Sequence, residues 1–474
     1  LALPAPPALA APDAATLQKL VERMEKLEAR NADLEKQVKS LKGESEEIAK
    51  GLDSPRLSQY EPELTSRLKG AEKDALEMKK SAKLADKLDG IKVGAALTTV
   101  AQHASGLPKG TSNGGSQLNY RADVTVELPL NPIGDIEQKV FAHVRMGQGQ
   151  GLNAPFSNLG YFASAPNAVA FRASGANPDD SVAILGQAWY QAAIPLPFGG
   201  FKPYSREKLE LTFGKMDIFG FFDQNTGAGD ESKQFLNSVF VHNPLLDAGG
   251  EVGVDANGFQ PGFVASYVNA TNKAEPWRLS LGVFGAGDKG SNYQKSLSSP
   301  LVMVQAEKQL KLFGGLNGNY RAYAWTRSQV TELDGLTTDR HTGIGLSVDQ
   351  RIGDGVNLFG RYGQLVKGEL PFNRAVAVGA QLNGSYWNRA ADAFGIGFSW
   401  LQTGDGYKNA TVDWNGSPLS FVPSGAETIT ELYYRYRISP QFELSPDLQW
   451  LTQGGGNPEA KSAYLLGLRA NIVY

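Results

Sequence analysis

From Ile91 to Tyr474, apolar and polar side chains alternate in strand-like runs, and this alternation most constrains what the chain can fold into. A period of two is that of a β-strand, whose successive side chains point to opposite faces. In the last run, Ser462 to Tyr474, one face is consistently apolar and is made of Tyr464, Leu466, Leu468, Ala470, Ile472 and Tyr474. By itself this run fits the closing strand of a soluble sandwich as well as a strand of a closed transmembrane barrel.

The charged faces of the other runs decide between these two folds. In Tyr120 to Leu130, for example, Val124 lies on the apolar face and Asp123 on the other. The arginines that fall on polar faces are Arg121, Arg145, Arg321, Arg327, Arg351, Arg361, Arg435, Arg437 and Arg469. Burying one unpaired ion costs several kcal/mol, so these faces must meet water and the opposite faces an apolar medium. The sequence therefore predicts an all-β fold, an antiparallel transmembrane β-barrel of about sixteen strands, each near the length that a tilted membrane strand needs.

Composition narrows the function classes. The chain has 474 residues, a formal net charge of −3 and no cysteine. Nucleic-acid binding requires a concentrated basic surface, and thiol chemistry requires cysteine, so neither is expected. No run of 18 or more apolar residues is present, so no membrane helix is expected.

The links between the runs alternate in length. Short links such as 353–355 and 439–441 alternate with long ones such as 147–181, 218–258 and 404–427. Bacterial outer-membrane barrels have short periplasmic turns and longer outer loops, so both ends of the barrel are expected on the periplasmic side. The aromatics expected to form interfacial girdles are Trp277, Trp387, Trp400, Trp450, Tyr433 and Tyr434.

The first 89 residues have a different pattern. Residues 1–12 consist only of Ala, Leu and Pro, and are read as a flexible arm or the remnant of an export signal. Residues 13–89 have heptad spacing, with Asn31 at a core position, and predict a helical coiled-coil stalk in the periplasm. A parallel coil, a folded-back hairpin and a single surface helix all remain open. The coil favours self-association, so a homo-oligomer is expected.

A barrel of about sixteen strands encloses an aqueous channel that a loop must narrow. The segment 219–257 is the preferred constriction loop, with Phe222, Asp223, Asn225, Asp230 and Glu231 as its candidates, and 147–181 competes for that role. An outer loop at an oligomer surface is the alternative for 219–257.

The polar faces predict the side chains that contact solutes. These channel-lining candidates are Arg121, Asp123, Glu127, Arg145, Arg321, Tyr323, Trp325, Arg327, Asp349, Arg351, Arg361, Glu431, Arg435, Arg437, Glu443, Asp447 and Arg469. Guanidinium groups and carboxylates can bind and orient hydroxyl-rich or charged solutes. The excess of Arg predicts a mild anion preference. Anchoring of a loop or bracing of the wall by ion pairs is an equally good explanation of the same residues.

Two clusters of motifs resemble the carbohydrate-selective porin family. The first is Gly214-Lys215-Met216-Asp217, Phe222-Asp223-Gln224-Asn225 and Phe235-Leu236-Asn237-Ser238; the second is Glu431-Leu432-Tyr433-Tyr434-Arg435-Tyr436, Ser445-Pro446-Asp447-Leu448-Gln449-Trp450 and Leu466-Gly467-Leu468-Arg469. The resemblance covers roughly Ile91 to the end. It implies a sixteen-stranded outer-membrane channel that passes sugars and other small solutes by diffusion, and a trimer. The amino-terminal helical stretch looks like the stalk of cyanobacterial-type porins, although the surface-layer-homology domain of those proteins was not found.

The expected function is thus a passive diffusion channel in the bacterial outer membrane, without cofactor or metal. One alternative is a structural tether that links the outer membrane to the cell wall or another periplasmic partner through the coil. An outer-membrane enzyme is less favoured, because His103, His143, His242 and His341 show no motif spacing with Ser or Asp. Asp179 and Asp180 are read as solvated loop residues, with Ca²⁺ binding as an alternative.

Overall fold

A computed structural model gives the fold of the chain. The structure describes residues 90–105, 115–153, 156, 165–171, 180–198, 204–246, 259–285, 297–334, 336–353, 355–410 and 421–474. The predicted arm and stalk, residues 1–12 and 13–89, lie outside these residues. The barrel belongs to the unit Gly90–Tyr474.

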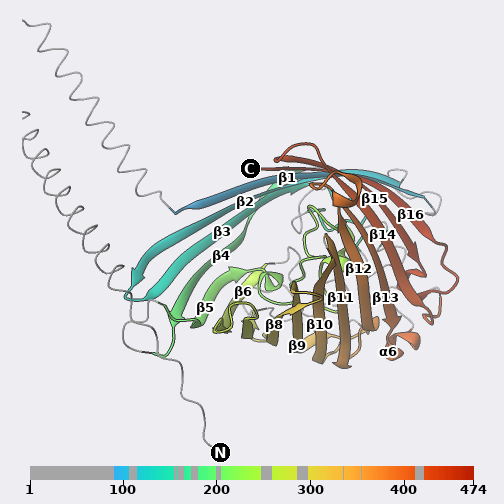
Figure 1. The fold of residues 1–474 in the computed structure, drawn as a ribbon. Coiled ribbons are helices and arrows are strands. Elements are labelled where there is room, and N and C mark those ends of the chain that lie inside the picture. Colours follow the sequence, from blue (N-terminus) through green and yellow to red (C-terminus); the bar gives the residue numbers. More distant parts are fainter. Residues whose placement is uncertain are drawn as a thin grey trace, which may run out of the picture. The chain divides into compact units, whose positions relative to one another are not determined.

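Sixteen antiparallel strands form one closed barrel in which each strand pairs with its neighbours in the sequence, and β1 pairs with β16 (Figure 1). The strands are β1 Lys92–Ser105, β2 Ser116–Ile133, β3 Ile136–Gln148, β4 Val182–Pro195, β5 Glu207–Met216, β6 Gln260–Asn269, β7 Trp277–Phe284, β8 Leu301–Leu312, β9 Leu316–Thr331, β10 Thr338–Gly353, β11 Val356–Lys367, β12 Phe372–Asn383, β13 Ala393–Thr403, β14 Ala426–Arg437, β15 Phe442–Thr452 and β16 Ala463–Val473. The predicted fold class and strand number are therefore confirmed.

The barrel closes through the run with which the sequence ends. Leu97 of β1 pairs with Ile472 of β16, and the Tyr474 amide donates a hydrogen bond of 2.8 Å to the Ala95 carbonyl oxygen. Closure leaves no strand edge with unpaired backbone groups, which an apolar membrane would not tolerate.

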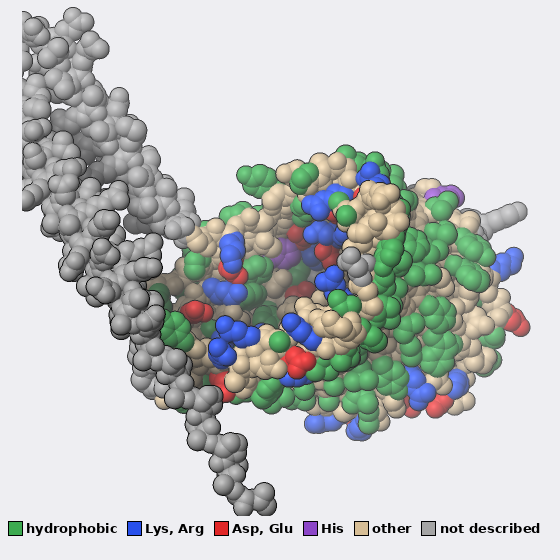
Figure 2. All heavy atoms as spheres, viewed as in Figure 1, with side chains coloured by type: hydrophobic (Ala, Val, Ile, Leu, Met, Phe, Trp, Pro, Cys, Tyr) green, Lys and Arg blue, Asp and Glu red, His purple; other side chains and the backbone are tan. Residues whose placement is uncertain are grey.

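The distribution of side chains over the wall is inverted relative to a soluble barrel. Leu346 and Ile472 are 46% and 48% exposed on the outer surface, whereas Asp349 and Arg469 are 2% and 1% exposed inside. Figure 2 shows apolar side chains over the outer wall and charged side chains gathered at the opening. Arg351, at the end of β10, is exposed. It pairs in register with Asn357, whose side chain donates a hydrogen bond to Thr226 of the segment inside the barrel, so Arg351 lies on the inner face of the wall. The outer face must therefore meet lipid, as the alternation predicted.

The girdle prediction is wrong for Tyr433. Trp277 and Trp450 are 39% and 45% exposed on the outer wall, but Tyr433 is 1% exposed and packs inside against Phe235. It lies one residue from Tyr434 on the same strand, so the two rings must face opposite sides.

The links alternate as predicted. β2–β3, β10–β11 and β14–β15 are joined by short links, whereas β3–β4, β5–β6 and β13–β14 are separated by long ones. The short helices of the described residues all lie in links: η2 Ile218–Gly220, α5 Ser238–Val241, η4 Gly384–Trp387, α6 Asp405–Lys408 and η5 Gly454–Gly456. No helix among the described residues has the length and apolar content to cross a membrane.

Candidate solute pathway

The link after β5 enters the barrel instead of leaving it. We call its described residues, 217–246, the inner loop; Figure 1 shows this green segment inside the wall. Two caps shape it locally: the Asp217 carboxylate accepts from the Phe219 amide at 2.9 Å before η2, and the Asn237 side chain accepts from the Val239 amide at 3.3 Å before α5. Such caps satisfy amides that a short helix leaves unpaired.

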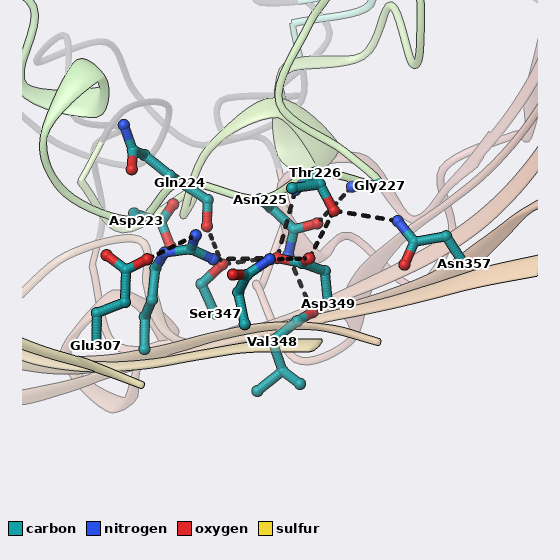
Figure 3. Close-up of polar contacts among 12 residues, drawn as sticks. Asp223, Gln224, Asn225, Thr226, Gly227, Glu307, Ser347, Val348, Asp349 and Asn357 are labelled. Atoms are coloured by element: carbon teal, nitrogen blue, oxygen red, sulfur yellow. Dashed lines mark hydrogen bonds and ion pairs between the residues drawn. The ribbon is translucent and has the colours of Figure 1, made fainter. Parts of the chain in front are cut away.

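Strands β9 to β11 hold the first half of the inner loop (Figure 3). The Arg361 guanidinium lies 3.1 Å from the Asp223 carboxylate, and the Tyr323 hydroxyl donates to the same carboxylate at 3.0 Å. Thr226 donates its hydroxyl to Asp349 at 2.5 Å, and Ser347 donates to the Gln224 carbonyl oxygen at 2.8 Å. The Arg361 and Asp223 side chains are 2% and 0% exposed, so this ion pair is fully dehydrated.

The other side of the barrel holds the second half. Glu431 of β14 accepts from the amides of Leu236 and Asn237, the latter at 2.9 Å. Arg469 of β16 donates to the carbonyl oxygens of Glu231 and Gln234 at 2.9 and 2.6 Å. The inner loop also reaches β2, where the Glu231 carboxylate lies 2.8 Å from Arg121.

Aromatic rings fill the space between the inner loop and the wall. Phe235 packs against Phe240, Phe359 and Tyr433 with ring centroids 4.9 to 5.2 Å apart. Phe222 meets Phe284 of β7 edge to face. The inner loop is thus fixed by a small apolar core as well as by ion pairs.

Part of the competing link, between β3 and β4, lies against the inner loop. The Ala168 amide donates to the Leu236 carbonyl oxygen at 2.8 Å, and the Asn167 side chain donates to Asn119 of β2 at 2.7 Å. Gln449 of β15 donates to the Pro166 carbonyl oxygen at 2.9 Å. Both candidate links therefore contribute residues to the interior of the barrel.

A cavity of about 570 Å³ remains between the inner loop and strands β3 to β8. We call it the vestibule. Four of the residues that line it are aromatic, and most of the others carry an amide or a charge. The lining is Lys139, Phe141, Gln187, Trp189, Gln191, Glu210, Gly220, Phe221, Gln224, Val268, Pro276, Trp277, Arg278, Glu307 and Gln309. Its volume falls within the roughly 300–1,000 Å³ typical of small-molecule sites.

Comparison with known proteins identifies the family. The family model described as carbohydrate-selective porin, OprB family, matches residues 120–474. The chain belongs to this porin family. The described barrel also resembles the high-pH structure of Pseudomonas putida OprB, with a TM-score of 0.64 and 18% identity, over 83% of this chain and 96% of that chain.

Two relatives are similar in sequence to this porin. Porin AaxA of Chlamydia pneumoniae is 27% identical over 158 residues, which are 33% of this chain and 33% of AaxA. An uncharacterized protein of Aquifex aeolicus (strain VF5) is 24% identical over 361 residues, which are 76% of this chain and 91% of that protein. Family and fold together place the barrel in the bacterial outer membrane as a porin.

The predicted channel-lining residues of this porin fall into two groups, both on the inner side of the wall. The inner loop covers most of one group, which is buried and comprises Arg121, Arg321, Tyr323, Trp325, Arg327, Asp349, Arg361, Glu431, Asp447 and Arg469. Several of these side chains hold the loop, which is the alternative explanation given above. The members nearer water are Asp123, Glu127, Arg145, Arg351, Arg435 and Arg437, with Glu443 buried beside the last two. Direct contact with solute remains a prediction for this second group.

Several of the lumen arginines are paired with carboxylates, which weakens the basis of the predicted anion preference. Asp123 accepts from Arg121 at 2.8 Å and from Arg145 at 2.7 Å, and Arg321 lies 3.0 Å from Asp349 and 3.2 Å from Glu307. Because carboxylates neutralise these arginines, counting Arg alone overstates the positive potential of the lumen.

The aromatic wall of the vestibule was not among the residues predicted from the sequence to line the channel. Phe141 and Trp189 are directly opposite in the β3–β4 register, and their rings stack with centroids 4.8 Å apart. A signal was present, because Phe141 shares the parity of Lys139 and Arg145 on the charged face of its strand.

Metal binding has no candidate in the part of the chain that the structure describes, where no cluster of three or more His, Asp or Glu side chains could hold an ion. Asp179, half of the suggested Ca²⁺ pair, lies outside the described residues.

Proposed function

We propose that this porin passes small, hydrophilic and mainly uncharged solutes, sugars among them, by passive diffusion through the side of the lumen bounded by β3 to β8. The observation that carries the proposal is the inner loop. It is bonded to strands β2, β8 to β11, β14 and β16, and it leaves the vestibule open on the remaining side. A path bounded on one side by the inner loop and on the other by the strands limits the size of the solutes that pass, while the solutes stay hydrated.

The constriction role of Phe222, Asp223, Asn225, Asp230 and Glu231 is part of this proposal. Phe222 and Asp223 are buried and serve to fix the loop, whereas Asp230 and Glu231 are half-buried at its surface. We infer that Glu231, held by its ion pair with the buried Arg121, places its charge near Asp123 and Arg145 at the narrowest part.

Liposome swelling tests this function. Purified protein in vesicles should give swelling rates that fall steeply from a pentose to a disaccharide and a trisaccharide. The matched variant is Phe235→Ala, which removes the apolar support of the loop, because the Phe235 ring packs against Phe240 and Phe359. Loosening the loop should raise the rate for the larger sugars more than for the pentose. Equal rates for all sugars in the parent protein, or no swelling at all, would refute the proposal.

We also propose a homotrimer, and a periplasmic stalk formed by residues 13–89 behind an arm of residues 1–12. Support comes from the heptad spacing of the sequence and from the outer wall, whose apolar residues suit lipid or another barrel. Sedimentation in detergent should give the mass of three protomers, and removal of residues 1–89 tests whether the coil contributes. A channel-inactive barrel that still binds the cell wall through the coil would favour the tether function instead.

A further inference from the structure

The aromatic wall of the vestibule is uncharged and takes no part in the ion pairs that fix the inner loop. Its rings are therefore available to contact a solute. Lys139, Glu210 and Arg278 lie within a few residues of the ends of β3, β5 and β7 that adjoin the β2–β3, β4–β5 and β6–β7 links. These ends lie on the same side of the barrel as the short β10–β11 and β14–β15 turns, which is the periplasmic side of outer-membrane barrels. The vestibule is therefore on the periplasmic side of the inner loop.

The rings are held in place before any solute arrives. Phe141 and Trp189 stack with an interplanar angle of 23°, and Phe221 of the inner loop meets Trp189 at 5.9 Å and 70°. The Trp189 indole nitrogen donates to the Gln187 side chain at 3.2 Å, and Lys139 lies 5.6 Å from the indole centroid. All three rings are half-buried, so they keep some surface toward the cavity. A preorganised apolar wall avoids the entropic cost of ordering side chains on binding.

The polar groups around this wall match a neutral hydroxylated molecule. Glu210 lies 3.2 Å from Lys208 and 3.3 Å from Arg278, and Lys139 lies 2.9 Å from Glu127, so cations and carboxylates compensate one another. Gln224 and Gln309 are exposed in the cavity lining. An amide both donates and accepts hydrogen bonds, as a sugar hydroxyl does.

We propose that Phe141, Trp189 and Phe221 form a holding site for one sugar ring in the periplasmic vestibule, with the ring's C–H face on the aromatic wall and its hydroxyls toward the amides. This inference rests on the proposed function, since it names where a permeating solute pauses. A site with an apolar wall distinguishes a cyclic sugar from a linear polyol of the same size, because only the ring presents a flat C–H face. A solute that enters from the periplasm should also reach this site faster than a solute from the outside, because the latter must first pass the inner loop.

Current fluctuations in planar bilayers test the site. Glucose should produce open-channel noise in the parent protein, and sorbitol, its linear counterpart, much less. Trp189→Ala should weaken glucose binding at least about fivefold, the effect of losing an aromatic contact, while its potassium chloride conductance stays equal or rises. Trp189→Phe should keep most of the binding. Trp450→Ala, which removes an exposed ring from the outer wall of β15, is the control and should bind glucose as the parent does.

Sidedness gives a second readout. In channels inserted with one orientation, glucose added on the periplasmic side should associate faster than glucose added outside. Equal noise from glucose and sorbitol, unchanged binding in Trp189→Ala, or faster association from the outside would overturn the holding site. If Trp189→Ala fails to insert, Phe221→Leu on the inner loop replaces it with the same expectation. Conductance and size-limited swelling without any glucose noise would overturn the site but leave the proposed function standing, whereas loss of swelling for every sugar would overturn the function itself.

Discussion

At the scale of single residues, buried ion pairs hold the inner loop of this porin against the barrel wall. Each charge stabilises the fold only while its partner is present. Asp223 carries its charge on the inner loop, and Arg361, more than a hundred residues away, supplies the matching cation at 3.1 Å. Removing one partner of a dehydrated pair leaves the other charge buried and alone, which costs far more than the pair gains.

Arg361→Ala should therefore destabilise the inner loop by about 3–5 kcal/mol, the usual penalty for breaking a buried pair. The matched control is Lys367→Ala, because the side chains of Lys367 and its partner Asp339 lie 3.3 Å apart and are 56% and 55% exposed. A pair of that kind contributes about 0–1 kcal/mol. Limited proteolysis of residues 217–246 in detergent measures the difference. Equal protection of the loop in both variants would show that Arg361 does not hold it.

Glu332 is expected to make the β9–β10 link sensitive to pH. Burial and the nearby carboxylates of Glu369 and Asp339 raise the pKa of Glu332 to about 7. A raised pKa means that the folded link favours the protonated acid. The contribution of Glu332 to the stability of the folded link is complete below the ordinary pKa of 4.5 and is lost as the pH rises through about 7.

Hydrogen exchange of residues 332–337 should therefore be slower at pH 5.5 than at pH 8.5 after correction for intrinsic rates. Glu332→Gln, which mimics the protonated acid, should flatten this dependence. Asp334→Asn is the control, since hydrogen bonds from the Thr337 and Leu336 amides lower the pKa of Asp334. Protection that increases with pH in the parent protein would contradict the assignment.

At the scale of the strand, glycines on the inner face let aromatic rings lie flat across neighbouring strands. A Cβ added at Gly345 of β10 would lie 2.1 Å from the Tyr323 ring of β9. Tyr323 in turn donates to Asp223, so a strand position and the loop are connected through one ring.

Gly345→Ala should displace Tyr323 and cost about 1–3 kcal/mol, as overpacking in a full interior does. Gly360→Ala on β11 is the control, because its added Cβ would meet only Val378 at 4.0 Å. The temperature at which the barrel unfolds in a gel-shift assay should fall for the first variant and stay the same for the second. Equal temperatures would mean that the ring can move aside at no cost.

Strand position also determines how the outer wall tolerates charge. Leu346 lies in the middle of β10 and is 46% exposed, whereas Val366 lies near the end of β11 and is 62% exposed. Leu346→Arg should destabilise the barrel in lipid by about 2–4 kcal/mol, and Val366→Arg by about 0–1, because the cost depends on depth. Unfolding in phospholipid vesicles by guanidinium measures both. A larger loss for Val366→Arg would place the membrane elsewhere on the wall.

At the scale of the whole molecule, the balance of charges follows from the pairing. The formal net charge is −3, and four of the lumen arginines, Arg121, Arg145, Arg321 and Arg361, have carboxylate partners. We therefore expect weak ion selectivity, in place of the anion preference predicted from the sequence. A tenfold potassium chloride gradient should give a reversal potential close to zero, and Asp123→Asn should shift it toward anions by exposing Arg145. A strongly anion-selective parent channel would contradict this expectation.

The sequence by itself determined the barrel: its strands, its inverted faces, its alternating links and the family to which it belongs. Alternation is a local property, because each residue's face depends only on its neighbours in the strand. The motif Phe222-Asp223-Gln224-Asn225 likewise marked the link that turns inward. Only the tertiary structure decided which inward residues meet water. Trp325 and Phe141 have the same signal in the sequence, yet Trp325 is 2% exposed whereas Phe141 lines the vestibule. That outcome depends on contacts between segments far apart in the chain, such as Glu431 with Leu236, and no local pattern encodes them.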